Sequence, residues 1–335
     1  MQAAKTWQGA GRSPTSVAGG RVRIFITGAS GLLGQAIVDA LVRRGDEAVA
    51  LSRRARPPAA PGIRWVVGDP ASGHSAATAS DDWTGALAGC DAVVHLAGEP
   101  IGDKRWNEER KARICASRID GTRGLVAALG RIPAAARPRV LVVANGIDYY
   151  PFDASETPWA EDGVAGAGFL EDLCAAWQAE AERATDLDVR VVTMRTGIVL
   201  SRDGGALPSL VRPFRMFAGG RIGHGRQWFS WVHVDDVVRA YLFAIDHPEL
   251  AGPVNLVAPT PVRAADLARA MGTALRRPAW FPVPRFALKL AAGEIAGYLA
   301  EGRKVVPTKL LAAGFAFAHP ELAGALDGLV GRRPS

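Results

Sequence analysis

The chain has 335 residues, of which 48% are hydrophobic and 22% charged, and its formal net charge is +7. This length suits one large α/β domain carrying a smaller lobe. No apolar run reaches the roughly 18 residues that span a bilayer, so we expect no membrane segment. The basic residues are mostly arginines scattered along the chain rather than gathered in one block, so we also expect no nucleic-acid partner.

Three cysteines, Cys90, Cys115 and Cys174, lie far apart in the sequence and form no CxxC pair. This spacing indicates neither a disulfide framework nor a metal site, so we expect no bound metal and a reducing, cytoplasmic location. Residues 1–20 contain no acidic residue and no apolar core segment, which argues against a secretory signal. We interpret them as a disordered leader, with a transit peptide as the alternative.

From residue 22 onward, short apolar runs alternate with amphipathic stretches. The runs expected to be strands are residues 22–27, 47–52, 63–67, 91–97, 139–144 and 189–196. The stretches expected to be helices are residues 32–44, 82–89, 107–131 and 168–185. Each strand is too apolar to have one wet face, and the alternation repeats. This pattern predicts an α/β fold with a doubly wound parallel sheet, whose ligands bind at the carboxyl ends of the strands.

After about residue 200 the pattern changes to loops rich in Gly and Pro, a helix near 234–246 and further helical stretches. We therefore interpret residues 21–200 as the sheet domain, to which some later segments return. Residues 201–335 are interpreted as a smaller substrate lobe.

The first strand is followed at once by a glycine-rich turn, "TGASGLLG", and then by a helix. Gly28 permits the tight turn, Gly31 lets backbone N–H groups approach a pyrophosphate, and Gly34 lets the helix pack on the strand. A plain glycine-rich turn is the alternative, but a strand before it and a helix after it favour dinucleotide binding. The residues expected to line this part of the site are Thr27, Gly28, Ser30, Gly31, Leu32, Leu33 and Gly34.

The end of the second strand is expected to face the adenosine ribose. An NAD site would place Asp or Glu there, whereas this chain has Ser52, Arg53 and Arg54. Two guanidinium groups and a hydroxyl suit a 2′-phosphate, so NADP(H) is favoured, with a solvated arginine rim as the alternative. Asp69 is either a ligand of the adenine amino group or a turn-forming residue.

The fourth strand ends in "HLAGEP", and its small residues let a cofactor lie across the strand ends. Leu96, Ala97 and Gly98 are therefore expected to line the cofactor site. Arg118 falls in the long helix that follows, where it either reaches a carboxylate or phosphate or forms a surface ion pair.

A family resemblance rests on motifs that run in order from about residue 22 to residue 330. They include "TGASGLLG", "HLAGEPIGDKRW", "ICASRIDGTRGL", "MRTGIVLSRDGGAL", "GRQWFSWVHVDDVV" and "PTKLLAAGFAFAHPEL". The sequence resembles the extended short-chain dehydrogenase/reductases, and within them the YfcH-like epimerase-family proteins with a DUF1731 C-terminal domain. The resemblance implies a Rossmann domain that binds a dinucleotide, a C-terminal region at about 283–331, and nicotinamide contacts from Arg195, Thr196 and Gly197.

The residues that carry catalysis in most of that superfamily are missing from this chain. Those proteins use a Ser or Thr after the fifth strand and a Tyr-x-x-x-Lys on the next helix, where the phenol moves a proton and the lysine lowers its pKa. Here the serine position is Asn145, and Leu170 and Cys174 take the places of Tyr and Lys. The subgroup also lacks the Tyr-Lys pair.

Replacement groups follow the fifth strand, in "NGIDYYP", where the subgroup usually reads Ser-Ala-Thr-Gly-Tyr-Tyr-Gly. We expect Tyr149 or Tyr150 to donate a proton and Asn145 to hold a carbonyl oxygen, the alternative being that both rings pack between the lobes. Lys104 is expected either to bind an anionic substrate or lower a phenol pKa, or else to lie in a solvated loop.

These features predict an NADP(H)-dependent oxidoreductase acting on a small or medium organic carbonyl, enone or alcohol, as a monomer or homodimer. One alternative is a nucleotide-sugar epimerase, which the missing pair disfavours more because epimerisation needs acid/base catalysis twice. The other is a dinucleotide-binding regulatory or scaffold protein without turnover.

Overall fold

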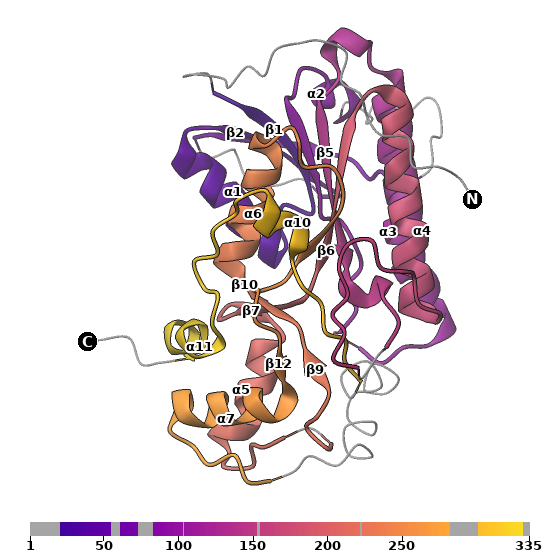
Figure 1. The fold of residues 1–335 in the computed structure, drawn as a ribbon. Coiled ribbons are helices and arrows are strands. Elements are labelled where there is room, and N and C mark those ends of the chain that lie inside the picture. Colours follow the sequence, from indigo (N-terminus) through magenta and orange to yellow (C-terminus); the bar gives the residue numbers. More distant parts are fainter. Residues whose placement is uncertain are drawn as a thin grey trace.

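The protein is represented by a computed structural model, shown in Figure 1, which describes residues 21–54, 61–72, 83–102, 104–152, 155–221, 223–281 and 301–330. The expected leader, residues 1–20, lies outside the described residues. Residues 283–300, the first part of the DUF1731-like region, also lie outside them.

Seven parallel strands form the central sheet, in the order β11-β6-β5-β4-β1-β2-β3. Their bounds are β1 (Arg23–Thr27), β2 (Glu47–Ser52), β3 (Ile63–Val67), β4 (Ala92–His95), β5 (Val140–Gly146), β6 (Arg190–Thr196) and β11 (Gly252–Leu256). The first six confirm the predicted strands. The order reverses between β1 and β4, which is the kind of position where open α/β sheets bind ligands.

Helices cover both faces of this sheet (Figure 1). α1 (Leu32–Arg44) and α6 (Val234–Asp246) pack against one face, where Ile37 and Tyr241 join the same apolar core as the strands. α2 (Trp83–Leu87), α3 (Glu108–Arg131) and α4 (Phe169–Glu182) cover the other face through a second core. Apolar burial on both sides explains why the strands read as continuous hydrophobic runs.

A smaller lobe lies below the carboxyl ends of the strands (Figure 1). It contains β7 (Ile198–Ser201), β8 (Gly204–Gly205), β9 (Trp228–Phe229), β10 (Trp231–His233), β12 (Val262–Arg263), α5 (Leu207–Arg215), α7 (Ala264–Leu275) and α11 (Leu322–Val330). Its own core gathers around Trp231. Because α6, β11 and α10 (Thr308–Ala312) pack with the sheet domain, the region 201–335 enters the lobe, leaves it and returns to it.

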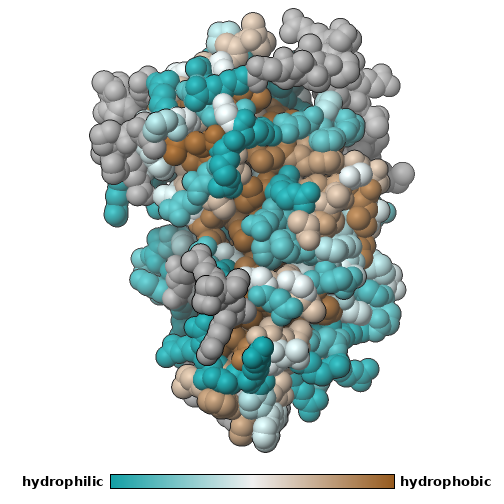
Figure 2. Space-filling view, turned by 90° about the vertical axis from the view of Figure 1, so that its left-hand side faces the viewer, coloured by the Kyte–Doolittle hydropathy of each residue, from teal (hydrophilic) through white to brown (hydrophobic). Residues whose placement is uncertain are grey.

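The surface of the helical face that carries α1 and α6 is mixed. Figure 2 shows hydrophobic residues gathered in the upper half of this face, with polar residues between them. Within the described part of the chain, no helix is both long and apolar enough to cross a membrane.

Candidate active site

The glycine turn after β1 has no room for side chains. Gly28 has a φ of +70°, and a Cβ there would lie 2.8 Å from the backbone carbon of Leu96. A Cβ on Gly34 would lie 2.2 Å from the Gly28 carbonyl oxygen. The predicted turn and the close helix–strand contact are therefore both present.

The N-terminus of α1 is open to an anion. Its N-cap is Gly31, which makes no side-chain capping bond, and its first turn has no acidic residue. The first N–H groups of a helix have no partner within the helix, so they attract phosphate when nothing else caps them. Ser30 is exposed beside them, and Leu32 and Leu33 are half-buried. These residues fit a dinucleotide pyrophosphate.

Thr27 joins the end of β1 to the residues at the end of β4. Its hydroxyl is buried and accepts hydrogen bonds from the N–H groups of Leu96, at 3.2 Å, and Ala97, at 3.1 Å. Its own hydrogen therefore goes to His95 Nδ1, 2.6 Å away, and His95 Nε2 donates to Thr122 Oγ1 at 3.1 Å. Burial, aided by the nearby charge of Arg118, lowers the pKa of His95 to about 4, so the ring is neutral.

The end of β2 turns sharply and presents arginines to solvent. Ser52 Oγ accepts the N–H of Arg54 at 3.2 Å, and the side chains of Arg53 and Arg54 are exposed. Neither guanidinium has an ion-pair partner among the described residues. Asp69 behaves as the turn-forming alternative predicts, since its carboxylate accepts the N–H of Ala71 at 3.0 Å.

Asn145 is not presented to a substrate, contrary to prediction. It is 5% exposed, its Nδ2 donates to the Cys174 carbonyl at 3.0 Å, and its Oδ1 accepts the N–H of Gly146 at 2.7 Å. The amide therefore ties the end of β5 to α4, at the helix position where the superfamily has its lysine.

Tyr150 is also wrongly predicted as a proton donor. It is completely buried, its hydroxyl donates to Asn255 Oδ1 at 2.7 Å, and that hydroxyl accepts from Arg195 Nη1 at 2.7 Å. Burial raises the pKa of this phenol. The Arg195 side chain, predicted as a nicotinamide contact, belongs to the same hydrogen-bond network. Its Nε and Nη2 both donate to Gln178 Oε1.

Tyr149 differs from its neighbour. It ends the 3-10 turn η2 (Ile147–Tyr149), directly after β5, and is only partly buried. Its ring lies 3.5 Å from the guanidinium carbon of Arg195, a cation–π contact. Among the described residues its hydroxyl has no hydrogen-bond partner.

The remaining predicted residues lie in two places. Thr196 ends β6 and Gly197 follows it. A Cβ on Gly197 would lie 2.6 Å from the Ser230 carbonyl oxygen, so no side chain fits there. Lys104 is exposed in the loop after β4.

Sequence analysis missed a buried charge cluster beside β5. Arg303, from the C-terminal region, is 3% exposed and donates to Asp148 Oδ1 at 2.8 Å and to Glu171 Oε1 at 3.3 Å. Burial raises the pKa of Glu171, whose Oε2 has no partner. The only signal in the sequence is Asp148 itself, an acid in place of a glycine of the usual pattern.

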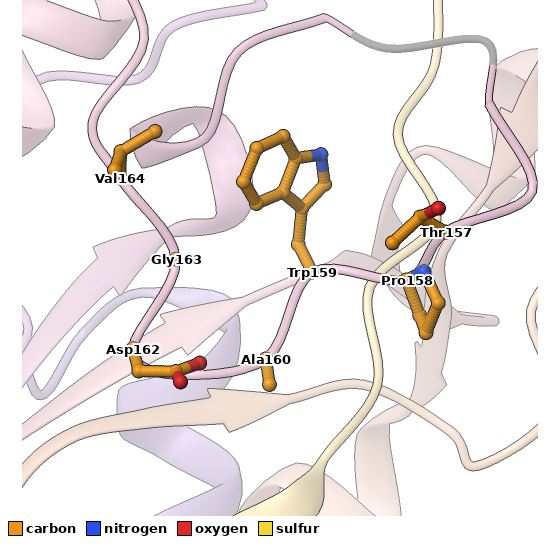
Figure 3. A pocket seen from close by; sticks show the side chains of 7 residues that line it. All are labelled: Thr157, Pro158, Trp159, Ala160, Asp162, Gly163 and Val164. Atoms are coloured by element: carbon orange, nitrogen blue, oxygen red, sulfur yellow. The ribbon is translucent and has the colours of Figure 1, made fainter.

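The loop between β5 and α4 holds a pocket of about 300 Å³, lined by residues 157–160 and 162–164. Figure 3 shows the Trp159 indole rising between Val164 on one side and Thr157 and Pro158 on the other. Trp159 stacks on Tyr150, so the pocket adjoins the β5 segment. It contains none of the predicted site residues, and we do not assign the substrate to it.

One group among the described residues brings together side chains of the kind that bind metals: His233, Asp235 and His319. The two imidazole rings are stacked 3.7 Å apart with 27° between their planes. His233 Nδ1 accepts the N–H of Asp235 at 3.1 Å, and His319 Nε2 lies 3.3 Å from Asp235 Oδ2, so protein partners occupy these atoms. The group instead joins the start of α6 to the C-terminal region.

Comparisons with known proteins agree with this geometry. Residues 24–257 match the NAD dependent epimerase/dehydratase family, and residues 283–329 match the domain of unknown function DUF1731. This confirms the resemblance stated above.

The chain is 38% identical to the chloroplastic "Epimerase family protein SDR39U1 homolog" of Arabidopsis thaliana over 319 residues, which is 92% of this chain and 87% of that one. It is 35% identical to "Epimerase family protein SDR39U1" of Bos taurus, over 92% of this chain and 100% of the relative.

Among solved structures, the crystal structure of human epimerase family protein SDR39U1 (isoform 2) with NADPH matches with a TM-score of 0.80 and 32% identity. The match covers 92% of this chain and 99% of that one, and the doubly wound α/β prediction is confirmed. The chain thus belongs to the NAD dependent epimerase/dehydratase family, in the branch that carries a C-terminal DUF1731 domain.

Proposed function

We propose that the protein is an NADP(H)-dependent oxidoreductase that acts on a small or medium organic carbonyl, enone or alcohol. The observation that carries the proposal is the uncapped N-terminus of α1 behind the tight glycine turn. The end of β2, with Ser52, Arg53 and Arg54 and no carboxylate, suits the 2′-phosphate of NADP(H). The NADPH in the human relative's structure supports the same cofactor.

When bound, NADP(H) supplies or takes the hydride. The chain's own groups hold the cofactor and the reacting oxygen. Gly28, Gly31 and Gly34 let the backbone approach the pyrophosphate, and Ala97 and Gly98 leave space across the end of β4. Tyr149 donates a hydrogen bond to the substrate oxygen, since its hydroxyl is the one of the neighbouring pair that has no partner among the described residues.

Cofactor choice is tested by titrating NADPH and NADH into the full chain and following nicotinamide fluorescence. We expect tighter NADPH binding, and about tenfold weaker NADPH binding in Arg53→Ser/Arg54→Ser with NADH affinity unchanged, since charged hydrogen bonds are lost. Arg43→Ser, which removes an exposed arginine from the last turn of α1, is the matched control. Equal affinities, or tighter NADH, would refute the choice of cofactor.

Turnover is tested separately, with a panel of ketones, aldehydes and enones and NADPH oxidation as the readout. Activity that falls in Tyr149→Phe while NADPH affinity stays constant supports the proposed role of that phenol. If NADPH binds tightly and no compound oxidises it, the alternative of a dinucleotide-binding protein without turnover gains support.

A further inference from the structure

We propose that the substrate carries an anionic group, a carboxylate or a phosphate, which is bound by Arg118. The proposal rests on the proposed function and adds the chemical class of its substrate. It starts from a buried positive charge that forms no direct ion pair among the described residues.

Arg118 lies in the middle of α3 and is 8% exposed. Its Nη1 donates to the carbonyl oxygen of Glu99 at 2.9 Å, and more weakly to the Ile114 carbonyl at 3.4 Å and Ser117 Oγ at 3.5 Å. These acceptors are all neutral. Burial lowers the pKa of the guanidinium, although the group stays charged at neutral pH.

The rest of the guanidinium has no partner. Neither Nε nor Nη2 of Arg118 forms a hydrogen bond with any described residue, and neither atom is sealed from solvent. The nearby carboxylate of Glu99 favours the charged guanidinium, but it pairs directly with Arg110, at 3.5 Å, and forms no ion pair with Arg118 among the described residues. A buried charge without a direct ion-pair partner is costly, so such a charge is usually paired. Two free donors on one edge of a guanidinium match the two oxygens of a carboxylate or phosphate.

The other buried arginines of the described chain are all better satisfied. Arg303 pairs with two carboxylates, and Arg110 reaches Glu99 and a carbonyl oxygen. Arg190 and Arg195 use both of their terminal nitrogens in hydrogen bonds. Arg118 alone among these leaves a terminal nitrogen unused, so its position is not explained by internal packing.

Arg118 also lies at the right place in the fold. A Cβ added to Gly98 would be 3.0 Å from the guanidinium carbon, so the guanidinium lies directly against the exposed end of β4. On its other side it faces the Trp177 ring of α4, at 5.3 Å. Gly98 lines the expected cofactor site, so an anion bound to Arg118 would lie beside that site.

The charge of Arg118 acts on Cys174, which takes the place of the usual lysine. Burial raises the pKa of the Cys174 thiol to about 12, so this residue brings no charge. The positive charge that a lysine at the position of Cys174 would bring to α4 is thus provided by Arg118 of α3. Arg118 differs from that lysine in having the planar fork that binds an oxyanion through two hydrogen bonds.

The test uses the full chain saturated with NADPH and calorimetric titration with three probes. Malonate represents a carboxylate, inorganic phosphate a phosphate, and malonamide is the neutral match for malonate. We expect at least one anion to bind at least about tenfold more tightly than malonamide, because charge-assisted hydrogen bonds are the stronger kind. The tighter anion distinguishes a carboxylate substrate from a phosphate substrate.

Two variants assign the binding to Arg118. Arg118→Met is expected to weaken anion binding about tenfold or more and to leave NADPH affinity within about twofold. Arg118→Lys keeps the charge without the fork, and about threefold weaker binding is expected. Arg113→Met, an exposed change on the same helix that removes a pair with Glu109, is the control and leaves anion binding unchanged.

The proposal would be overturned if neither anion binds more tightly than malonamide. It would also be overturned if the anion affinities of the wild type and Arg118→Met are equal. If Arg118→Met does not fold, the Lys variant decides, and unchanged anion affinity there refutes the role of the fork. Failure to bind NADPH in the first titration would refute the proposed function instead, so the two failures are distinguishable.

Discussion

The turn between β1 and α1 and the segment between β5 and α4 lie on the same edge of the sheet and use their polar groups in opposite ways. In the first, backbone N–H groups at the start of α1 are left uncapped. In the second, Asn145, Tyr150 and Arg303 are buried and bonded to other parts of the protein. The first region leaves backbone donors without a side-chain cap, whereas much of the second uses its polar groups to hold the protein together.

This difference follows from what each region is made of. The turn works through backbone geometry, which needs only glycines at fixed positions. The β5 segment works through side chains, and its partners come from distant parts of the chain, such as Asn255 and Arg303. Residues that usually do chemistry there have become packing residues, so we look for the chemistry in their neighbours Tyr149 and Arg118.

The largest loss of stability is expected from Arg303→Met, which removes the cation that holds the segment after β5 in place. It leaves Asp148 and the buried Glu171 without their cation, and removing one partner of a buried ion pair costs about 3–5 kcal/mol of unfolding free energy. Chemical denaturation measures it. Lys304→Met, next in the chain and paired with Glu156 at 3.7 Å nearer the surface, should cost less than about 1 kcal/mol. Equal losses would show that the cluster is not a special anchor.

His95 ties β1 to β4 and gives the next largest effect. Its pKa is lowered from 6.5 to about 4, so below pH 6.5 the unfolded chain takes up a proton that the folded protein refuses. Between pH 7 and pH 4, the wild type should lose about 3 kcal/mol of unfolding free energy from this group alone. His95→Gln should lack this part of the pH dependence. Parallel pH profiles for the two proteins would contradict the buried neutral ring.

The local elements were predictable from the sequence because the signals are local. The glycine turn, α1 and the six apolar strands each depend on a few consecutive residues. β11 was not predicted, since it begins with Gly252 and Pro253 and has only three further residues to show a strand pattern. Pro253 is tolerated because β11 lies at the edge of the sheet.

Which of the two paired tyrosines is buried could not be predicted from such local signals. Tyr149 and Tyr150 are adjacent aromatic residues in one turn, and the sequence does not tell which of them faces inward. Tyr150 is buried because Arg195 and Asn255, 45 and 105 residues away, meet its hydroxyl. Arg303 likewise meets Asp148 across 155 residues of sequence. Such contacts depend on the finished fold.

The cofactor turn is tested by Gly34→Ala, with a smaller expected effect. The new Cβ would lie 2.2 Å from the Gly28 carbonyl oxygen, so strand and helix must separate, at a cost of about 1–3 kcal/mol. NADPH affinity should fall with it, because the N–H groups move away from the pyrophosphate. Gly324→Ala in α11, where nothing lies within 4 Å of the new Cβ, is the control and should leave both quantities unchanged or slightly improve stability. Unaltered NADPH affinity in Gly34→Ala would mean that the turn is not the pyrophosphate site.

The smallest effect separates the two tyrosines. Tyr150→Phe removes a hydroxyl that joins Arg195 to Asn255, and leaving buried partners unsatisfied costs about 1–3 kcal/mol. Tyr149→Phe should change stability by less than about 0.5 kcal/mol, because its hydroxyl has no hydrogen-bond partner in the described part of the chain.

Alkaline titration followed by tyrosinate absorbance gives a second measurement of this difference. Burial raises the pKa of Tyr150, so Tyr150→Phe should remove absorbance that appears only above the usual phenol range. If Tyr149→Phe destabilises the protein as much as Tyr150→Phe does, then both phenols are structural. Proton transfer would in that case have to be assigned to a group outside the paired tyrosines, and the case for turnover at this site would rest on Arg118 and the bound cofactor alone.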